Sequence, residues 1–140
     1  MMYSAVALFC EDIREEKSGT DTIVGVFPDN VNVPTFPFTF AKIAIYLRIN
    51  MPADSDSPKR IEYWLTSPDN IPFPRTPIEA ELIERARRDA MERGSVIGGT
   101  ISKAVIGFLQ LKTPGRLNLV VEIDGRELVA GTLNVQPNPS

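Results

Sequence analysis

The sequence predicts a mostly-β fold, a two-sheet antiparallel sandwich of the immunoglobulin-like kind with one inserted surface helix. About seven or eight short segments are apolar or alternate apolar with polar residues, and turn residues separate them. Only one segment has the spacing and end signals of a helix, so strands do not alternate with helices as in a parallel α/β sheet. The length of 140 residues suits a single domain, which we place at 1–136, with a frayed tail at 137–140.

The first two predicted strands form a hairpin of residues 3–14 and 22–27. Val6 to Cys10 is apolar at every position, as expected of a strand that is covered on both faces. Lys17 to Thr20 supplies the turn. Pro28 to Phe40 is rich in proline, which cannot donate to a sheet ladder, so we expect a loop or an edge there.

The middle of the chain holds two clearly alternating strands. In residues 41–50, the apolar members are Ile43, Ile45, Leu47 and Ile49. Residues 60–66 alternate in the same way, with Trp64 on the less apolar face. A second proline-rich loop follows from Pro68 to Pro77.

One helix is predicted at about 77–93. Thr76 is placed to cap it, Pro77 takes the first helical position, and Glu79 completes a capping box. Gly94 ends the helix. Its thin apolar stripe consists of Ile78, Leu82, Ala86 and Ala90. We expect the helix to lie on the sandwich surface or to cover one open end.

Three more strands are expected near the C-terminus. Residues 95–102 stay ambiguous because Gly98 and Gly99 interrupt an apolar run, whereas residues 104–111 indicate a strand. Leu117 to Ile123 alternates regularly, and Asp124-Gly125 is the strongest hairpin signal in the chain. The last strand covers about 127–135.

The composition excludes several kinds of chemistry. The chain has no histidine, which removes Ser-His-Asp and Cys-His nucleophile systems and the commonest metal ligand. Its net charge is -3 and its basic residues are interleaved with acids, so we expect no nucleic-acid partner. No segment has the roughly 18 apolar residues of a membrane helix, so we expect no membrane partner.

The single cysteine and the first residues bear on location. Cys10 has no partner for an intramolecular disulfide, which fits a reducing compartment. The apolar start lacks a positive region, and Glu11 and Asp12 interrupt it, so we expect no secretory signal. These features predict a cytoplasmic protein. We interpret Cys10 itself as a small buried residue and not as a nucleophile.

Two stretches resemble a known but uncharacterised family. They are LFCEDIREE (8–16) followed by IVGVFPDNV (23–31), and TPGRLNLVVEIDGREL…GTLNV (113–135). Together they resemble a family of small proteins of bacteria and their phages or prophages, a domain of unknown function. The resemblance implies a β-sandwich and brings no activity or functional residues.

Two acidic groups are candidates for chemistry or for metal binding. Paired carboxylates among Glu11, Asp12, Glu15 and Glu16 suit acid–base chemistry or Ca²⁺, and the alternative is a strand that leaves the core for solvent. The loop carboxylates Asp29, Asp54, Asp56 and Asp69 suit Ca²⁺ if the fold gathers them at one end. The run Gly94 to Thr100 lacks the lysine of a phosphate loop, and we interpret it as a turn.

Aromatic residues in the proline-rich loops are the candidate partner-binding residues. Exposed rings on stiff loops make good binding anchors, because little entropy is lost on docking. The alternative is that the rings cover the ends of the sandwich. The candidates are Phe36, Phe38, Trp64 and Phe73.

We therefore expect a protein that is not an enzyme and needs no cofactor. The first hypothesis is a non-catalytic interaction or structural module that binds an unknown protein partner or associates with itself, in a phage- or prophage-related setting. The alternative is a small-ligand or Ca²⁺-binding domain that uses the loop carboxylates.

Overall fold

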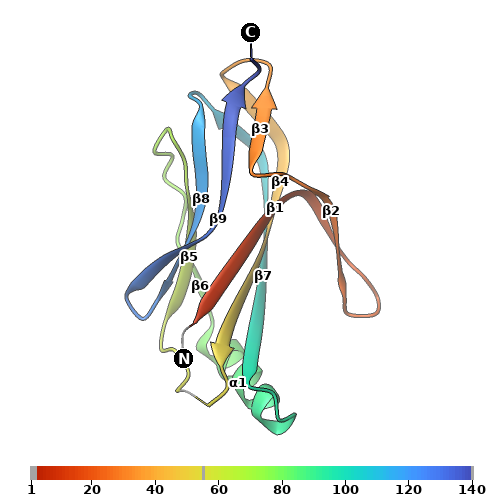
Figure 1. Cartoon of the computed structure of the whole chain (residues 1–140), viewed down its shortest axis with the longest axis vertical. Coiled ribbons are helices and arrows are strands. Elements are labelled where there is room, and N and C mark those ends of the chain that lie inside the picture. The colour runs from red at the N-terminus through yellow and green to blue at the C-terminus, as the bar shows by residue number, and fades with distance from the viewer. Residues whose placement is uncertain (1–2, 55, 140) are drawn as a thin grey trace.

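The computed structural model describes residues 3–54 and 56–139, and over these residues the chain forms two sheets and one helix (Figure 1). The predicted mostly-β sandwich with one helix is confirmed. One sheet has four strands in the order β2-β1-β4-β7, and the other has five in the order β3-β9-β8-β5-β6. The elements are β1 Ser4–Glu15, β2 Asp21–Val26, β3 Asn30–Val33, β4 Phe38–Pro52, β5 Ile61–Thr66, β6 Thr76–Ile78, α1 Ala80–Glu92, β7 Ile97–Leu111, β8 Gly115–Ile123 and β9 Arg126–Pro137.

The core lies between the two sheets, where alternate residues of facing strands are buried. β4 contributes Ile43, Leu47 and Ile49, and β8 contributes Leu117 and Val121, all with 1% exposure or less. The pairs are antiparallel except that β3 runs parallel to β9, so the five-stranded sheet is mixed. β3 lies at the edge of that sheet, as the prolines on either side of it predicted.

β7 is longer than the sequence indicated, because it includes Gly98 and Gly99. A Cβ on Gly98 would lie 3.0 Å from the carbonyl oxygen of Ala86 and 3.4 Å from Cβ of Ala90. Glycine at this position therefore lets α1 pack closely against β7. Glycines that weaken a strand pattern in sequence here mark a close approach of two elements.

The helix begins at Ala80, three residues later than the sequence predicted. Thr76–Ile78 pairs with β5 as the short edge strand β6, and Glu79 at the N-cap position makes no side-chain cap hydrogen bond. The predicted capping box is therefore wrong, because pairing with β5 and packing of Ile78 against the core override the local cap signal.

The buried face of α1 also differs from the predicted stripe. Ile83 and Ala90 are fully buried, whereas Leu82 is 46% exposed. The helix packs through one large side chain, and its opposite face is stabilised by ion pairs from Glu81 to Arg85 and from Glu84 to Arg88. No helix among the described residues is long and apolar enough to cross a membrane.

The four-stranded sheet bends where β4 and β7 change the face that they bury. Phe40 and its partner Leu109 face the core, and so do Ile43 and its partner Ile106, although two residues separate them along each strand. Phe108 lies at the bend with a φ of 54°. A bulky side chain in this left-handed region is a conformational outlier.

Candidate interaction surface

The face of the four-stranded sheet that points away from the five-stranded sheet exposes apolar side chains. The strand register places Val6 beside Arg48 and Arg48 beside Ile101, and it places Ala44 beside Val105. Val6 is 53% exposed and Val105 is 57% exposed. We call this surface the outer apolar face, and its residues are Val6, Leu8, Val26, Ile97, Ile101 and Val105.

The outer apolar face contrasts with the corresponding face of the five-stranded sheet. There, polar side chains satisfy one another: Thr132 donates to Asn118 at 2.7 Å, and Asn134 donates to Asn30 at 2.8 Å. A solvent-facing sheet surface is ordinarily polar. A contiguous apolar group on such a surface is typical of an interaction site.

A hollow lies over one end of the outer apolar face. Its volume is about 630 Å³, and it is lined by Val6, Leu8, Tyr46, Arg48, Asn50, Ser95, Ile97 and Gly99. The guanidinium of Arg48 donates to the side chain of Asn50 at 3.3 Å. The hollow therefore offers an apolar floor and one fixed positive group, a combination that suits protein side chains.

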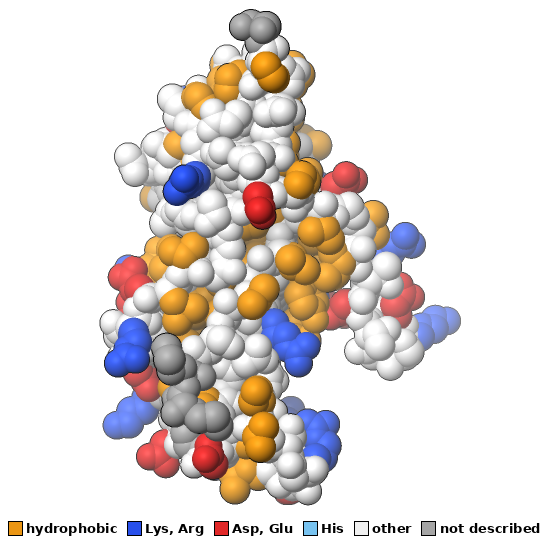
Figure 2. Space-filling view, in the orientation of Figure 1, with side chains coloured by type: hydrophobic (Ala, Val, Ile, Leu, Met, Phe, Trp, Pro, Cys, Tyr) orange, Lys and Arg blue, Asp and Glu red, His pale blue; other side chains and the backbone are white. Residues whose placement is uncertain are grey.

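The β1–β2 hairpin stands beside this face, and Lys103 on β7 contacts it. Lys103 Nζ, on β7, lies 2.8 Å from Asp21 Oδ1 and 3.0 Å from Glu15 Oε1. The two carboxylates lie directly opposite each other across the hairpin, and the ammonium offsets their repulsion. The hydrogen bond to Asp21, followed by the one to Glu15, raises the pKa of Lys103. Figure 1 shows the hairpin standing off the body, and the space-filling view in Figure 2 shows a notch between the two.

Cys10 lies at the end of the β1–β4 ladder, where β1 stops pairing with β4 and continues into the hairpin. Its side chain has no exposed surface, and its thiol donates to the carbonyl of Ala44 at 3.5 Å. Burial raises the pKa of the Cys10 thiol, and the nearby charge of Asp12 acts in the same direction. The thiol is therefore protonated and shielded, as the sequence interpretation expected.

Three of the four sequence-predicted aromatic residues pack against the core. Phe36, Phe38 and Phe73 are partly buried there, and the ring of Phe38 lies edge-on to that of Phe40 at 5.0 Å. These rings serve as packing elements at the margin of the core. Their role in binding a partner stays a prediction.

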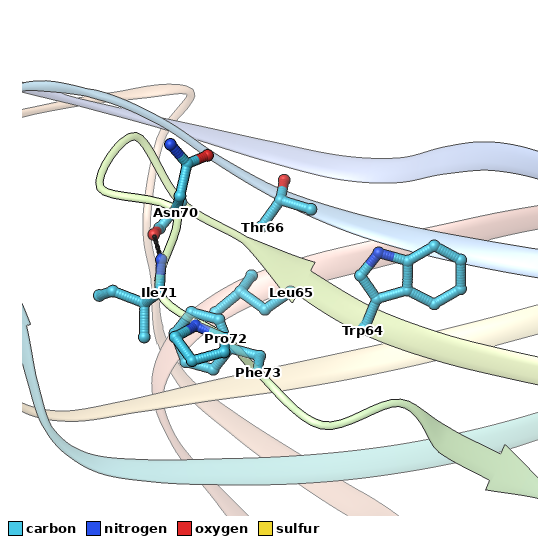
Figure 3. Close-up of a pocket in the computed structure, with 8 residues that line it drawn as sticks. Trp64, Leu65, Thr66, Asn70, Ile71, Pro72 and Phe73 are labelled. Atoms are coloured by element: carbon cyan, nitrogen blue, oxygen red, sulfur yellow. Dashed lines mark hydrogen bonds between the residues drawn. The ribbon is translucent and has the colours of Figure 1, made fainter.

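Trp64, the fourth predicted residue, lies on the outer side of the five-stranded sheet. The guanidinium of Arg75 covers its ring at 3.8 Å from the centroid, and Arg75 also contacts Glu122 at 3.4 Å. Trp64 is among the residues that line a hollow of about 240 Å³, and Figure 3 shows its ring pointing away from Ile71, Pro72 and Phe73, which line the same hollow. Its partner-binding role also stays a prediction.

The acidic residues of the first hairpin take separate partners. Asp12 contacts Lys42 at 2.8 Å, Glu15 contacts Lys103, and Glu16 accepts a hydrogen bond from the hydroxyl of Thr22. The hydrogen bond from Lys42 is the main reason that the pKa of Asp12 is lowered. The acidic residues that are close together in the sequence are therefore spread along the hairpin, where they contact different partners.

The loop carboxylates are not gathered in one place either. Asp69 accepts hydrogen bonds from the backbone N–H groups of Lys112 and Thr113 and from the Thr113 hydroxyl, which lower its pKa and fix the β7–β8 turn. Over residues 3–54 and 56–139, no three Asp, Glu or Cys side chains are close enough together to hold a metal ion.

Sequence reasoning missed the outer apolar face, although a signal was present. Ile97, Ile101 and Val105 recur every four residues on one side of β7, with Gly99 and Lys103 between them. In β1, both sides of the strand are apolar, which the sequence interpretation took to mean cover on both faces. The structure leaves one of these faces open.

Comparison with known protein families shows to which of them the chain belongs. The model of a family of unknown function, DUF6941, matches residues 5–136. The match confirms the resemblance of the two terminal stretches to an uncharacterised family, and it extends over the middle strands and the helix. No curated protein and no solved structure matches the chain.

Proposed function

We propose that this chain, which belongs to the DUF6941 family of unknown function, is a non-catalytic interaction module that acts through protein–protein contacts. The observation that supports this most is the outer apolar face. It joins side chains from β1, β2 and β7 into one surface, and a hollow of about 630 Å³ lies over part of it. Burial of such a surface on a partner stabilises a complex by the hydrophobic effect.

The charged groups near this face support the same proposal. Arg48 lies beside Val6, and Lys103 lies beside Tyr46, which is beside Leu8. Protein interfaces commonly combine an apolar centre with Arg and Tyr. Because Lys103 is already engaged by Asp21 and Glu15, its burial on a partner would not leave an unpaired charge.

Setting and location complete the proposal. The resemblance to proteins of bacteria and their phages or prophages supports a place in a phage- or prophage-related assembly. The single, buried thiol of Cys10 supports a reducing compartment, the cytoplasm. The absence of histidine from the sequence supports a role without catalysis.

The test is affinity capture of the tagged protein from a lysate of its own host, followed by mass spectrometry. A Val6→Ser/Leu8→Ser variant alters the outer apolar face on β1. Val129→Ser is the matched control, because Val129 is also an exposed valine, at 58%, but lies on β9. We expect a specific partner with the wild type and the control, and its loss with the double variant.

The opposite result is equally clear. If the double variant is folded and captures the same partner as the wild type, the outer apolar face is not the binding surface. Changing Phe36, Phe38 and Phe73 together is a poorer test, because these rings pack against the core and their loss would destabilise the fold.

A further inference from the structure

A row of three side chains on the outer side of the four-stranded sheet is covered at one end only. Ala44 points to this side, because its neighbours Ile43 and Ile45 face the core. It pairs with Cys10 on β1 and with Val105 on β7, so the three side chains form one row across the sheet. Val105 is 57% exposed, whereas Cys10 and Ala44 have no exposed surface.

The outer part of the β1–β2 hairpin, residues 12–24, lies over the covered end of this row, and we call it the strap. Lys42 on β4 contacts Asp12, at the base of the strap, at 2.8 Å. Lys103 on β7 contacts Asp21, nearer its tip, at 2.8 Å. Because β4 lies between β1 and β7, a segment that reaches both lysines crosses the sheet over β4.

The strap is held mainly by these charged contacts. None of its residues is buried, although it lies over two residues that have no exposed surface. Its apolar residues Ile13, Ile23 and Val24 are only partly buried. Figure 2 shows a notch between the hairpin and the body. Segments with little buried apolar surface open locally at a low free energy, so the strap has the properties of a segment that opens by itself.

A hinge lies where the strap joins the sheet. The described register pairs the residues on either side of Glu11 and Gly25 but does not pair these two with each other. Gly25 has a φ of 63°, a conformation that glycine adopts without steric cost. One residue before Glu11, β1 makes its last pair with β4. Hinges are formed by a few such residues at the ends of elements, which absorb the change in backbone angles.

The Lys103 ammonium is the latch that holds the strap closed. It lies 2.8 Å from Asp21 Oδ1 and 3.0 Å from Glu15 Oε1. The two carboxylates lie opposite each other on the strap, so they repel each other when the ammonium is absent. The side chain of Glu15 is 76% exposed, and attraction between exposed charges is screened by salt.

We propose that the strap swings about Glu11 and Gly25, and that its release from Lys103 uncovers Cys10 and Ala44 for a protein partner. The inference rests on the proposed function and describes the regulation of the same surface. In the closed form the outer apolar face ends at the strap, and in the open form it continues along the whole row. A partner that binds the open form better shifts the equilibrium towards it.

The latch also indicates the chemistry of the partner. Opening leaves the Lys103 ammonium without Asp21 and Glu15, and the burial of an unpaired charge is strongly destabilising. A partner that covers the uncovered row therefore presents a carboxylate next to apolar side chains, and this carboxylate replaces Asp21 on Lys103. Partner and strap compete for the same ammonium group.

Cys10 measures the opening, because it is the single cysteine of the chain and is fully buried. The test is the rate at which N-ethylmaleimide modifies the native protein, followed by mass spectrometry. Lys103→Met and Glu15→Gln/Asp21→Asn should each raise this rate about 3- to 10-fold. Lys17→Met, an exposed position in the turn of the hairpin, should keep the wild-type rate.

Urea unfolding, measured in parallel, separates opening of the strap from unfolding of the domain. We expect the free energy of opening obtained from labelling to be lower than that of unfolding. If the two are equal, Cys10 reacts only in the unfolded chain and the inference is overturned. Labelling of both latch variants at the wild-type rate has the same meaning.

Salt provides an independent test of the latch. Raising NaCl from about 0.05 to about 1 M should accelerate the labelling of Cys10 in the wild type, because salt screens the ion pairs. It should change the rate of Lys103→Met much less. An equal response of the two proteins would show that Lys103 does not hold the strap.

Amide hydrogen exchange locates the hinge. In Glu15→Gln/Asp21→Asn, exchange should become faster in residues 12–24 and stay unchanged in residues 4–9, which pair with β4. Faster exchange in both segments would mean that the whole of β1 leaves the sheet, and it would overturn the hinge at Glu11 and Gly25.

Affinity capture tests the link to the partner. Glu15→Gln/Asp21→Asn opens the strap and keeps the ammonium, so it should recover more of the partner than the wild type does. Lys103→Met opens the strap but lacks the ammonium, so it should recover less than the double variant. Unchanged recovery by the double variant, with faster labelling of Cys10, shows that the strap does not regulate binding.

The failure of this inference is distinct from the failure of the proposed function. Slow labelling of Cys10 in both latch variants, in a protein that still captures a partner through Val6 and Leu8, overturns the strap and leaves the proposed function standing. A strap that opens in a protein whose capture is unaffected by the Val6→Ser/Leu8→Ser variant has the opposite meaning.

Discussion

Lys103 Nζ lies 2.8 Å from Asp21 Oδ1, and this ion pair joins residues that are 82 positions apart in the chain. Asp21 begins β2 and Lys103 lies in the middle of β7, so the contact connects strands at opposite edges of one sheet. The β1–β2 hairpin is consequently held beside the outer apolar face.

Removal of the Lys103 ammonium should release this hairpin without unfolding the domain. In Lys103→Met, we expect faster amide hydrogen exchange in residues 12–24 and unchanged exchange in β8. The variant loses the ammonium group that offsets the repulsion between the carboxylates of Glu15 and Asp21. Lys17→Met, in the turn of the same hairpin, is the control. Equal exchange in Lys103→Met and wild type would show that the hairpin is held by other contacts.

Acid should weaken the contact of α1 with the loop after β4. Glu84 accepts hydrogen bonds from Arg87 and Ser57, chiefly the former, which lower its pKa from 4.5 to about 2. Because the folded state favours the carboxylate, this stabilisation is complete above about pH 4.5 and is lost as the pH falls towards about 2.

The variant Glu84→Gln checks this dependence. Urea unfolding of Glu84→Gln should be less sensitive to pH between about 2 and 4.5 than that of the wild type, with lower stability near neutral pH. Glu92→Gln, an exposed position on the same helix, should keep the wild-type profile. If both variants follow the wild type, Glu84 has no part in acid unfolding.

Gly131 should tolerate no side chain. A Cβ at this position would be 2.5 Å from the Ala7 carbonyl oxygen, so Gly131→Ala forces β9 away from β1 and should cost about 1–3 kcal/mol. Gly107→Ala is the control, because nothing lies within 4 Å of its Cβ position. Chemical unfolding of the two variants measures the difference, and equal midpoints would contradict the close approach of β1 and β9.

Ile83 should account for most of the attachment of α1. The side chain is fully buried, so Ile83→Ala should lower the free energy of unfolding by about 2–5 kcal/mol. Leu82→Ala removes a neighbouring side chain that is 46% exposed and should cost much less. Thermal or urea unfolding compares them, and a larger loss in Leu82→Ala would support the stripe that the sequence predicted.

Most of the fold class could be predicted because strand alternation and turn chemistry are local. The Asp124-Gly125 turn joins β8 to β9, and the alternating apolar residues of β4 and β8 face the core as expected. The start of the helix could not be predicted in the same way. Thr76 and Glu79 have the residue types of a capping box, yet residues 76–78 pair with β5, a contact that depends on the fold of the rest of the chain.

The candidate site was predicted less well than the fold. Aromatic residues in proline-rich loops have the composition of binding anchors, but Phe36 and Phe73 pack against the core. The apolar residues of β1 and β7 have the composition of covered strands, but Val6 and Val105 are exposed. Composition states how apolar a segment is, whereas exposure depends on which other segment lies over it.

The sequence by itself determined the class of the fold and the approximate ends of most strands, because periodicity and turn signals depend on residues that are neighbours in the chain. Its composition, which lacks histidine, excluded chemistry that depends on that residue. Only the tertiary structure decided that Asp21 meets Lys103, that Gly98 receives α1, and that one sheet face and the β7 edge stay open. These features depend on strand order and on the bend of the four-stranded sheet, which arise from pairing between segments far apart in the chain.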